Sequence, residues 1–113
     1  MTGTPVVEKF KKLICWMLPK VSKFPKDQRY LLVDRIVQLM FDILERMIGV
    51  VYAIKGEKRN MLRKINLDID KLRYFIRIAY EMKYINLKGY DYFTKQIVET
   101  GKMIGGWYRY LNN

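Results

Sequence analysis

Apolar residues recur at intervals of three and four along most of this chain, which is the spacing that places side chains on one face of an α-helix. In one stretch the pattern is carried by Leu32, Ile36, Leu39, Ile43, Met47, Val50 and Ile54. In a later stretch it is repeated by Leu62, Ile65, Ile69, Leu72, Ile76 and Ala79. The sequence therefore predicts an all-α protein in which these two faces form much of the core.

Helix-breaking and helix-starting residues divide the chain into four helices. Pro5 and Pro25 suit the first position of a helix, where no backbone N–H is needed for the helical ladder. Lys55, Gly56 and Glu57 are predicted to form a turn, and Asn86 is predicted to cap the last helix. The expected helices cover residues 5–20, 26–54, 57–84 and 87–111. Short connections favour antiparallel neighbours, so the 113 residues are expected to form one domain, an antiparallel up-down four-helix bundle.

The second predicted helix carries more apolar surface than one core face requires. A second stripe lies about 100° round the helix from the first. It consists of Val33, Val37, Leu44, Ile48 and Val51. Exposed apolar surface of this size is typical of an interface, which predicts a homo-oligomer; the alternative is that the short first helix covers the stripe.

Basic residues outnumber acidic ones by 22 to 11, giving a formal charge of +11, which favours an acidic partner such as nucleic acid. On the third predicted helix a polar strip falls within about 80°. It consists of Arg59, Arg63, Asn66, Asp70, Arg73 and Arg77. Its four guanidiniums suit bidentate phosphate contacts. The alternative is a solvated face in which Asp70 pairs with Arg73 or Arg77, just as Asp42 and Arg46 can pair on the second helix.

The residues that usually carry catalysis are missing or poorly placed. The chain has no histidine, and its single cysteine, Cys15, is flanked by apolar residues and is expected to be buried. The carboxylates Asp34, Asp42 and Asp70 lie among arginines and are typical of salt-bridge partners. We therefore expect no enzyme activity, no metal and no cofactor. No stretch is apolar for long enough to span a bilayer, and no secretory signal is recognisable, so a cytoplasmic location is expected.

The last predicted helix contains glycines and aromatic residues, and the spacing of each group suggests what it does. Gly101 and Gly105 lie one turn apart and are expected to let a neighbouring helix approach closely; the alternative is that the GGW step ends or kinks the helix. Tyr90, Phe93 and Trp107 share one face, where they fit a core or a platform for stacked bases.

Three runs of sequence resemble a known family. The runs FPKDQRYLLVDRIVQLMFDILE, KLRYFIRIAYEMKYINLKGYDYF and GKMIGGW are similar to the accessory variability determinant proteins of diversity-generating retroelements. The resemblance implies a basic four-helix bundle that forms a homopentamer, binds template RNA or complementary DNA, and partners an error-prone reverse transcriptase in mutagenic retrohoming. It places the family's basic positions at Arg29, Arg35, Arg73 and Arg77 of this chain.

A second family of four-helix bundles shares the FPK opening of the second helix. Its members are encoded in intervening sequences of bacterial ribosomal RNA genes, and they imply an RNA-binding or passenger protein instead. The ILE segment, the LRYFIRIAYEMKYI run and the GGW ending favour the retroelement family.

Overall fold

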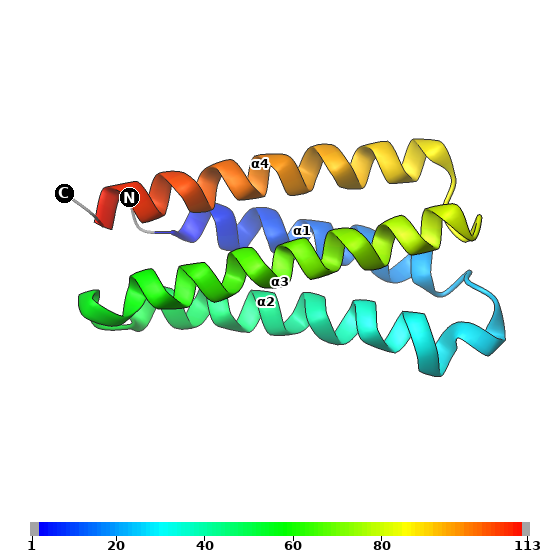
Figure 1. Ribbon diagram of the computed structural model, residues 1–113, viewed down its shortest axis with the longest axis horizontal. Helices are drawn as coiled ribbons and strands as arrows, with labels where there is room; N and C mark the ends of the chain where they lie inside the picture. Colours follow the sequence, from blue (N-terminus) through cyan, green and yellow to red (C-terminus); the bar gives the residue numbers. More distant parts are fainter. Residues whose placement is uncertain (1–2, 112–113) are drawn as a thin grey trace.

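The computed structural model describes residues 3–111, which form four long helices packed side by side (Figure 1). The helices are α1 (Thr4–Val21), α2 (Asp34–Tyr52), α3 (Lys55–Glu81) and α4 (Leu87–Leu111). Each helix contacts the next in sequence, and α1 also contacts α4. The start of α1 and the end of α4 lie at the same end of the bundle (Figure 1). The predicted all-α, antiparallel up-down four-helix bundle is therefore confirmed.

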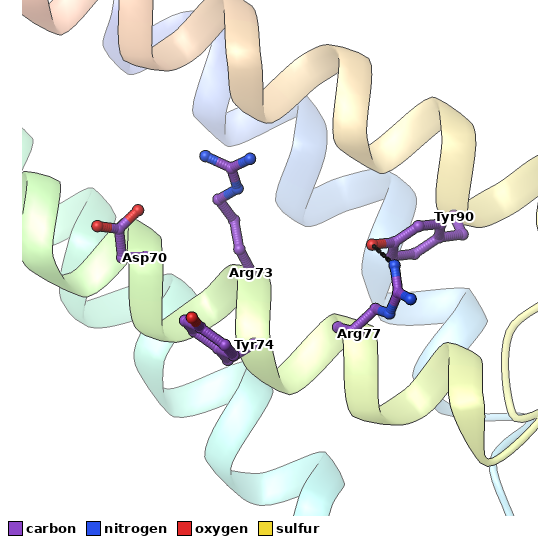
Figure 2. A pocket seen from close by; sticks show the side chains of 5 residues that line it. All are labelled: Asp70, Arg73, Tyr74, Arg77 and Tyr90. Atoms are coloured by element: carbon purple, nitrogen blue, oxygen red, sulfur yellow. Dashed lines mark hydrogen bonds between the residues drawn. The ribbon is translucent and has the colours of Figure 1, made fainter.

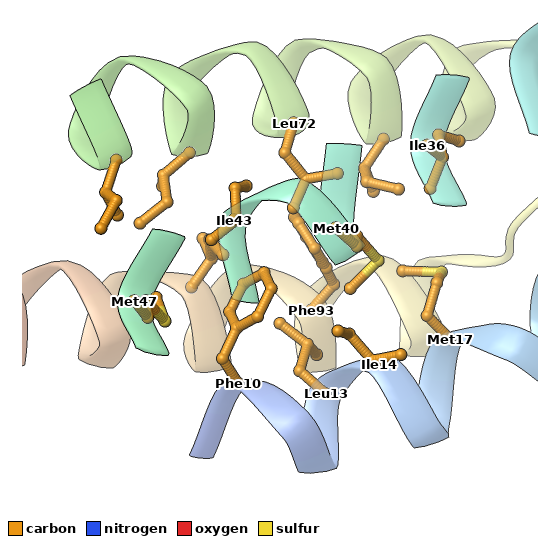
Figure 3. Packing of buried hydrophobic residues seen from close by; sticks show 14 of the residues in the cluster. Phe10, Leu13, Ile14, Met17, Ile36, Met40, Ile43, Met47, Leu72 and Phe93 are labelled. Carbon is orange, nitrogen blue, oxygen red and sulfur yellow. The ribbon is translucent and has the colours of Figure 1, made fainter. Parts of the chain in front are cut away.

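The core largely follows the predicted periodicity (Figure 3). All six apolar positions predicted for the α3 face are buried. On α2 the prediction is wrong at two positions. Met40 is 1% exposed and replaces Leu39, because it lies about 40° from Ile36 round the helix whereas Leu39 lies about 60° away. Ile54 is 70% exposed because α2 has already ended at Tyr52.

The second apolar stripe of α2 is mostly covered within the bundle. Four of its five members are half-buried and pack against the core, and only Ile48, at 42% exposed, counts as surface. Most of this stripe is thus covered by other parts of the same chain, in line with the alternative prediction, since α1 contacts α2. Other exposed apolar side chains include Leu31, Leu67, Ile78 and Met82.

The predicted continuous helix over 26–54 is wrong at its beginning. A 3-10 turn (Lys26–Gln28) and a π-helical turn (Arg29–Val33) precede α2. Phe24 is buried against Tyr84, with 5.6 Å between ring centroids, and this contact anchors the chain as it crosses from α1 to α2. The backbone then winds irregularly before the regular helix starts, since it must also bury Leu32.

The predicted turn at residues 55–57 is also wrong, because these residues form the first turn of α3. The reversal from α2 to α3 is made by Ala53 and Ile54 alone, whose extended ψ angles are 157° and 150°. Glu57 places a negative charge beside the positive end of the helix dipole and thereby favours an early start.

The end of α3 is fixed by a Schellman motif, three residues earlier than the predicted boundary at 84. The amide of Tyr84 donates to the carbonyl of Ala79 at 2.8 Å, and that of Lys83 donates to Tyr80 at 3.0 Å. Lys83 occupies the left-handed position with φ of 65°, where glycine is the usual residue.

Replacing Lys83 by glycine is therefore expected to raise the free energy of unfolding by about 0.5–1 kcal/mol, since glycine adopts this φ without steric strain. Denaturant unfolding followed by circular dichroism would measure the change. Lys95→Gly, at an exposed position well inside α4, is the matched control and should destabilise by about 1 kcal/mol. A loss of stability in Lys83→Gly would contradict this account of the motif.

The start of α4 agrees with its predicted cap, since the amide of Gly89 donates to Asn86 Oδ1 at 2.8 Å. The close approach predicted for the later glycines is wrong. A Cβ at Gly101 would meet nothing within 4 Å, and one at Gly105 would meet only an arginine side chain of α4 itself. Helix α4 continues through these glycines to Leu111 because its buried face packs regularly against the core.

Candidate nucleic-acid interface

Four exposed arginines of α3 follow the side of the helix that borders α4. We call them the α3–α4 arginine face: Arg59, Arg63, Arg73 and Arg77. They share this side because their spacing of four, ten and four residues returns to nearly the same helical direction. The α4 side chains that they meet are two tyrosines, Tyr90 and Tyr108.

The first pair of arginines converges on Tyr108. Arg59 and Arg63 each donate a hydrogen bond from Nη2 to the Tyr108 hydroxyl oxygen, at 3.3 and 3.1 Å. Both guanidiniums also lie over the tyrosine ring, at 5.3 and 5.9 Å from its centroid. The hydrogen bonds from Arg59 and then Arg63 lower the pKa of Tyr108 from its ordinary value. Within residues 3–111 neither arginine has an acidic partner, so this end of the face is strongly positive.

The other end of the face is organised around Tyr90. Arg77 donates from Nη1 to the Tyr90 hydroxyl at 3.3 Å, as the dashed line in Figure 2 marks, and from Nε to Glu81 at 3.4 Å. Tyr80 and Tyr90 stack with their centroids 4.5 Å apart, and the Arg77 guanidinium lies near both rings. The hydrogen bond to Tyr90 is the main cause that raises the pKa of Arg77, which stays charged.

Arg73 lies between these two clusters and, within the part of the chain that the structure describes, makes no hydrogen bond or ion pair. Asp70 is likewise unpaired there, although its side chain shares a pocket with Arg73 and Arg77 (Figure 2). The alternative in which Asp70 neutralises these arginines is therefore wrong in its detail, because the acidic partner of Arg77 is Glu81.

The two remaining predicted site residues lie away from this face. Arg35 lines a groove between α2 and α3, where it lies near Phe75 and Ile78. Arg29 lies beside the connection between α1 and α2, near Phe24. The structure therefore brings together four of the six predicted arginines and separates the other two from them.

Tertiary packing corrects the prediction for Cys15 and decides between the two alternatives for Phe93 and Trp107, for which the core role is confirmed. Cys15 is exposed, because the core-facing direction of α1 is taken by its neighbours Leu13 and Ile14. Phe93 and Trp107 are each 1% exposed, so they belong to the core and offer no platform for bases.

The predicted pair of Asp42 and Arg46 is replaced by two other contacts. Gln38 donates to Asp42 at 2.9 Å, while Arg46 forms an ion pair with Asp68 across the contact between α2 and α3. Asp68 is 6% exposed, and Lys71 Nζ lies 3.7 Å from its second carboxylate oxygen.

Sequence reasoning missed the tyrosines that orient the arginine face. A signal was present, because Tyr90 and Tyr108 are separated by 18 residues, which is five whole turns of an α-helix. The two rings must therefore lie on the same side of α4. Which helix that side faces could be read only from the packed bundle.

Two kinds of feature are absent from the described residues. No group of three or more potential metal ligands occurs among residues 3–111. No helix in the same range is long and apolar enough to cross a bilayer.

Comparison with known proteins identifies the family. No match is found among curated proteins. A family model described as bAvd-like matches residues 5–111, which is nearly the whole chain and spans all four helices and the arginine face. The chain therefore belongs to the bAvd-like family, the accessory variability determinant proteins of diversity-generating retroelements.

Proposed function

We propose that this protein is a non-enzymatic accessory factor that holds nucleic acid and an error-prone reverse transcriptase together in the cytoplasm of a bacterium, in support of mutagenic retrohoming. The nucleic acid is the template RNA or its complementary DNA. The observation that carries the proposal is the α3–α4 arginine face, where three of four exposed guanidiniums have no acidic partner within residues 3–111. The family match favours this function over the intervening-sequence alternative.

The arginine face would act by position. Arginines bind the phosphate oxygens of a nucleic acid whatever its base sequence. They therefore supply affinity and orientation but do not recognise bases. A protein that binds both a nucleic acid and a polymerase raises the effective concentration of one at the other. This mechanism needs no catalytic residue, and it predicts affinity that falls steeply as salt rises.

The protein partners would use the other sides of the bundle. Arg35 lies in the α2–α3 groove beside apolar side chains, and arginine among apolar and aromatic neighbours is typical of protein interfaces. Exposed Leu31, Ile78 and Met82 continue this surface. We propose that the surface around Arg29 and Arg35 contacts the reverse transcriptase or further copies of the chain in a homopentamer.

Reversing two charges on the face tests nucleic-acid binding. The double variant Arg73→Glu with Arg77→Glu is expected to bind a labelled 20-nucleotide RNA at least about tenfold more weakly in fluorescence anisotropy. Its plot of log affinity against log salt should be shallower by about 1.4, since two phosphate contacts to a single strand are lost. The helical signal and the light-scattering mass should stay at wild-type values, because both side chains are exposed.

A matched control separates the arginine face from overall charge. The double variant Lys88→Glu with Lys95→Glu changes the net charge by the same amount. These two lysines lie on another side of α4, about 150° round the helix from Tyr90. The control should lose much less affinity. Equal losses in both variants would show that the face has no special role. A wild-type protein whose light-scattering mass is that of a monomer and does not rise with co-expressed reverse transcriptase would contradict the accessory function itself.

A further inference from the structure

Beside Tyr90 the arginine face opens into a pocket of about 510 Å³ between α3 and α4. We call it the Tyr74 pocket; it is lined by Asp70, Arg73, Tyr74, Arg77 and Tyr90 (Figure 2). Resting on the nucleic-acid binding proposed above, we propose that this pocket selects single-stranded nucleic acid by stacking an unpaired base on Tyr74, with flanking phosphates on Arg73 and Arg77.

Tyr74 is the aromatic side chain in the pocket with a free ring. It is 73% exposed, and within residues 3–111 it makes no ring contact and no hydrogen bond. Tyr90, in contrast, is already stacked on Tyr80 and bonded to Arg77. An aromatic ring that is exposed beside guanidiniums is the arrangement by which proteins stack bases of single strands.

The two arginines of the pocket are prepared for phosphate in different ways. Arg77 is held in place by Tyr90 and Glu81, so it loses little freedom when it binds. Arg73 has no partner in the described chain, and its guanidinium points from α3 toward α4 (Figure 2). One fixed and one adaptable guanidinium, four residues apart on one helix, can contact phosphates on both sides of a stacked base.

Asp70 indicates that the pocket interior receives a base rather than a phosphate. Its carboxylate carries no hydrogen bond within residues 3–111, and it would repel a phosphate placed near it. A base brings no charge, and its amino groups can donate to a carboxylate. The phosphates are thereby directed to the guanidiniums, away from Asp70.

The same geometry disfavours a duplex. Paired bases are stacked inside a double helix and cannot reach Tyr74, so a duplex would contact only the arginines. Single strands therefore gain a contact that duplexes lack. Stacking on one aromatic ring is worth about 1–3 kcal/mol, which corresponds to a preference between about fivefold and 150-fold.

The test compares Tyr74→Leu, Tyr74→Phe and the wild type by anisotropy, with a 12-nucleotide RNA, a matched strand of abasic nucleotides, and a duplex. Tyr74→Leu should weaken binding of the normal strand at least about fivefold, and Tyr74→Phe should bind it within twofold of wild type. Both variants should bind the abasic strand and the duplex as wild type does. Tyr52→Leu, at an 85% exposed tyrosine near the end of α2, is the matched control and should change nothing.

The outcomes distinguish this inference from the proposed function. If Tyr74→Leu binds all three probes like wild type while the double charge reversal fails to bind, the arginine face stands and stacking on Tyr74 is overturned. If the wild type binds none of the probes, the proposed function fails as well. A lower light-scattering mass in Tyr74→Leu would assign the ring to a contact between copies and would also overturn the stacking site.

Discussion

Replacing Trp107 by alanine is expected to lower the free energy of unfolding by about 3–5 kcal/mol, as for other buried tryptophans truncated to alanine. Trp107 is 1% exposed and is among the largest fully buried side chains of the bundle. Its ring also packs against Gly3, where an added Cβ would clash with the indole. Loss of the indole would leave a cavity and would release the start of α1 from α4. Denaturant unfolding at one protein concentration would measure the change, since the proposed homopentamer would make stability depend on concentration.

The chain offers a matched control in its other tryptophan. Trp16 is only half-buried and packs at a tilt against Tyr92, with 4.6 Å between ring centroids. Trp16→Ala should therefore destabilise by about 2 kcal/mol or less. If Trp107→Ala does not fold, Trp107→Phe provides the measurement with a smaller cavity. Equal losses for the two alanine variants would mean that Trp107 does not anchor the end of the bundle.

Replacing Arg46 by methionine is expected to lower the free energy of unfolding by about 2–3 kcal/mol, because the buried carboxylate of Asp68 loses its ion-pair partner. Lys71, 3.7 Å away, would compensate only in part. The effect should fall below that of a fully buried pair, since the Arg46 side chain is 45% exposed. Thermal and denaturant unfolding would both report the loss.

Removing both charges separates the cost of an unpaired carboxylate from the value of the pair. The double variant Arg46→Met with Asp68→Leu should recover much of the stability lost in Arg46→Met, because no buried charge is left without a partner. A double variant less stable than Arg46→Met would contradict this account, because it would show that the Asp68 carboxylate carries no penalty when Arg46 is absent.

The position of each side chain round its own helix could be predicted from the sequence. On α3 the buried face and the arginine face both lie where 3.6 residues per turn place them, because this angle depends only on local spacing. The same local geometry explains why Asn86 could be recognised as a cap.

Predictions failed where a contact joins residues far apart in the chain. Arg46 was expected to pair with Asp42, one turn away, but packing places Asp68 of α3 nearer to it. Cys15 was expected to be buried because of its apolar neighbours, but only one direction of α1 faces the core. The irregular turn before α2 depends on where Phe24 is anchored, and the sequence around it carries no sign of that contact.

From the amino-acid sequence alone one could predict that the chain forms helices, which side of α3 is buried, and that its arginines share one direction, since helical periodicity fixes angles round an axis. The packed bundle was needed to learn that this direction borders α4, that Tyr90 and Tyr108 meet the guanidiniums there, and that Arg29 and Arg35 lie apart. The difference arises because an angle round one helix is set by residues a turn apart. The neighbour that it faces is set by the packing of the whole bundle.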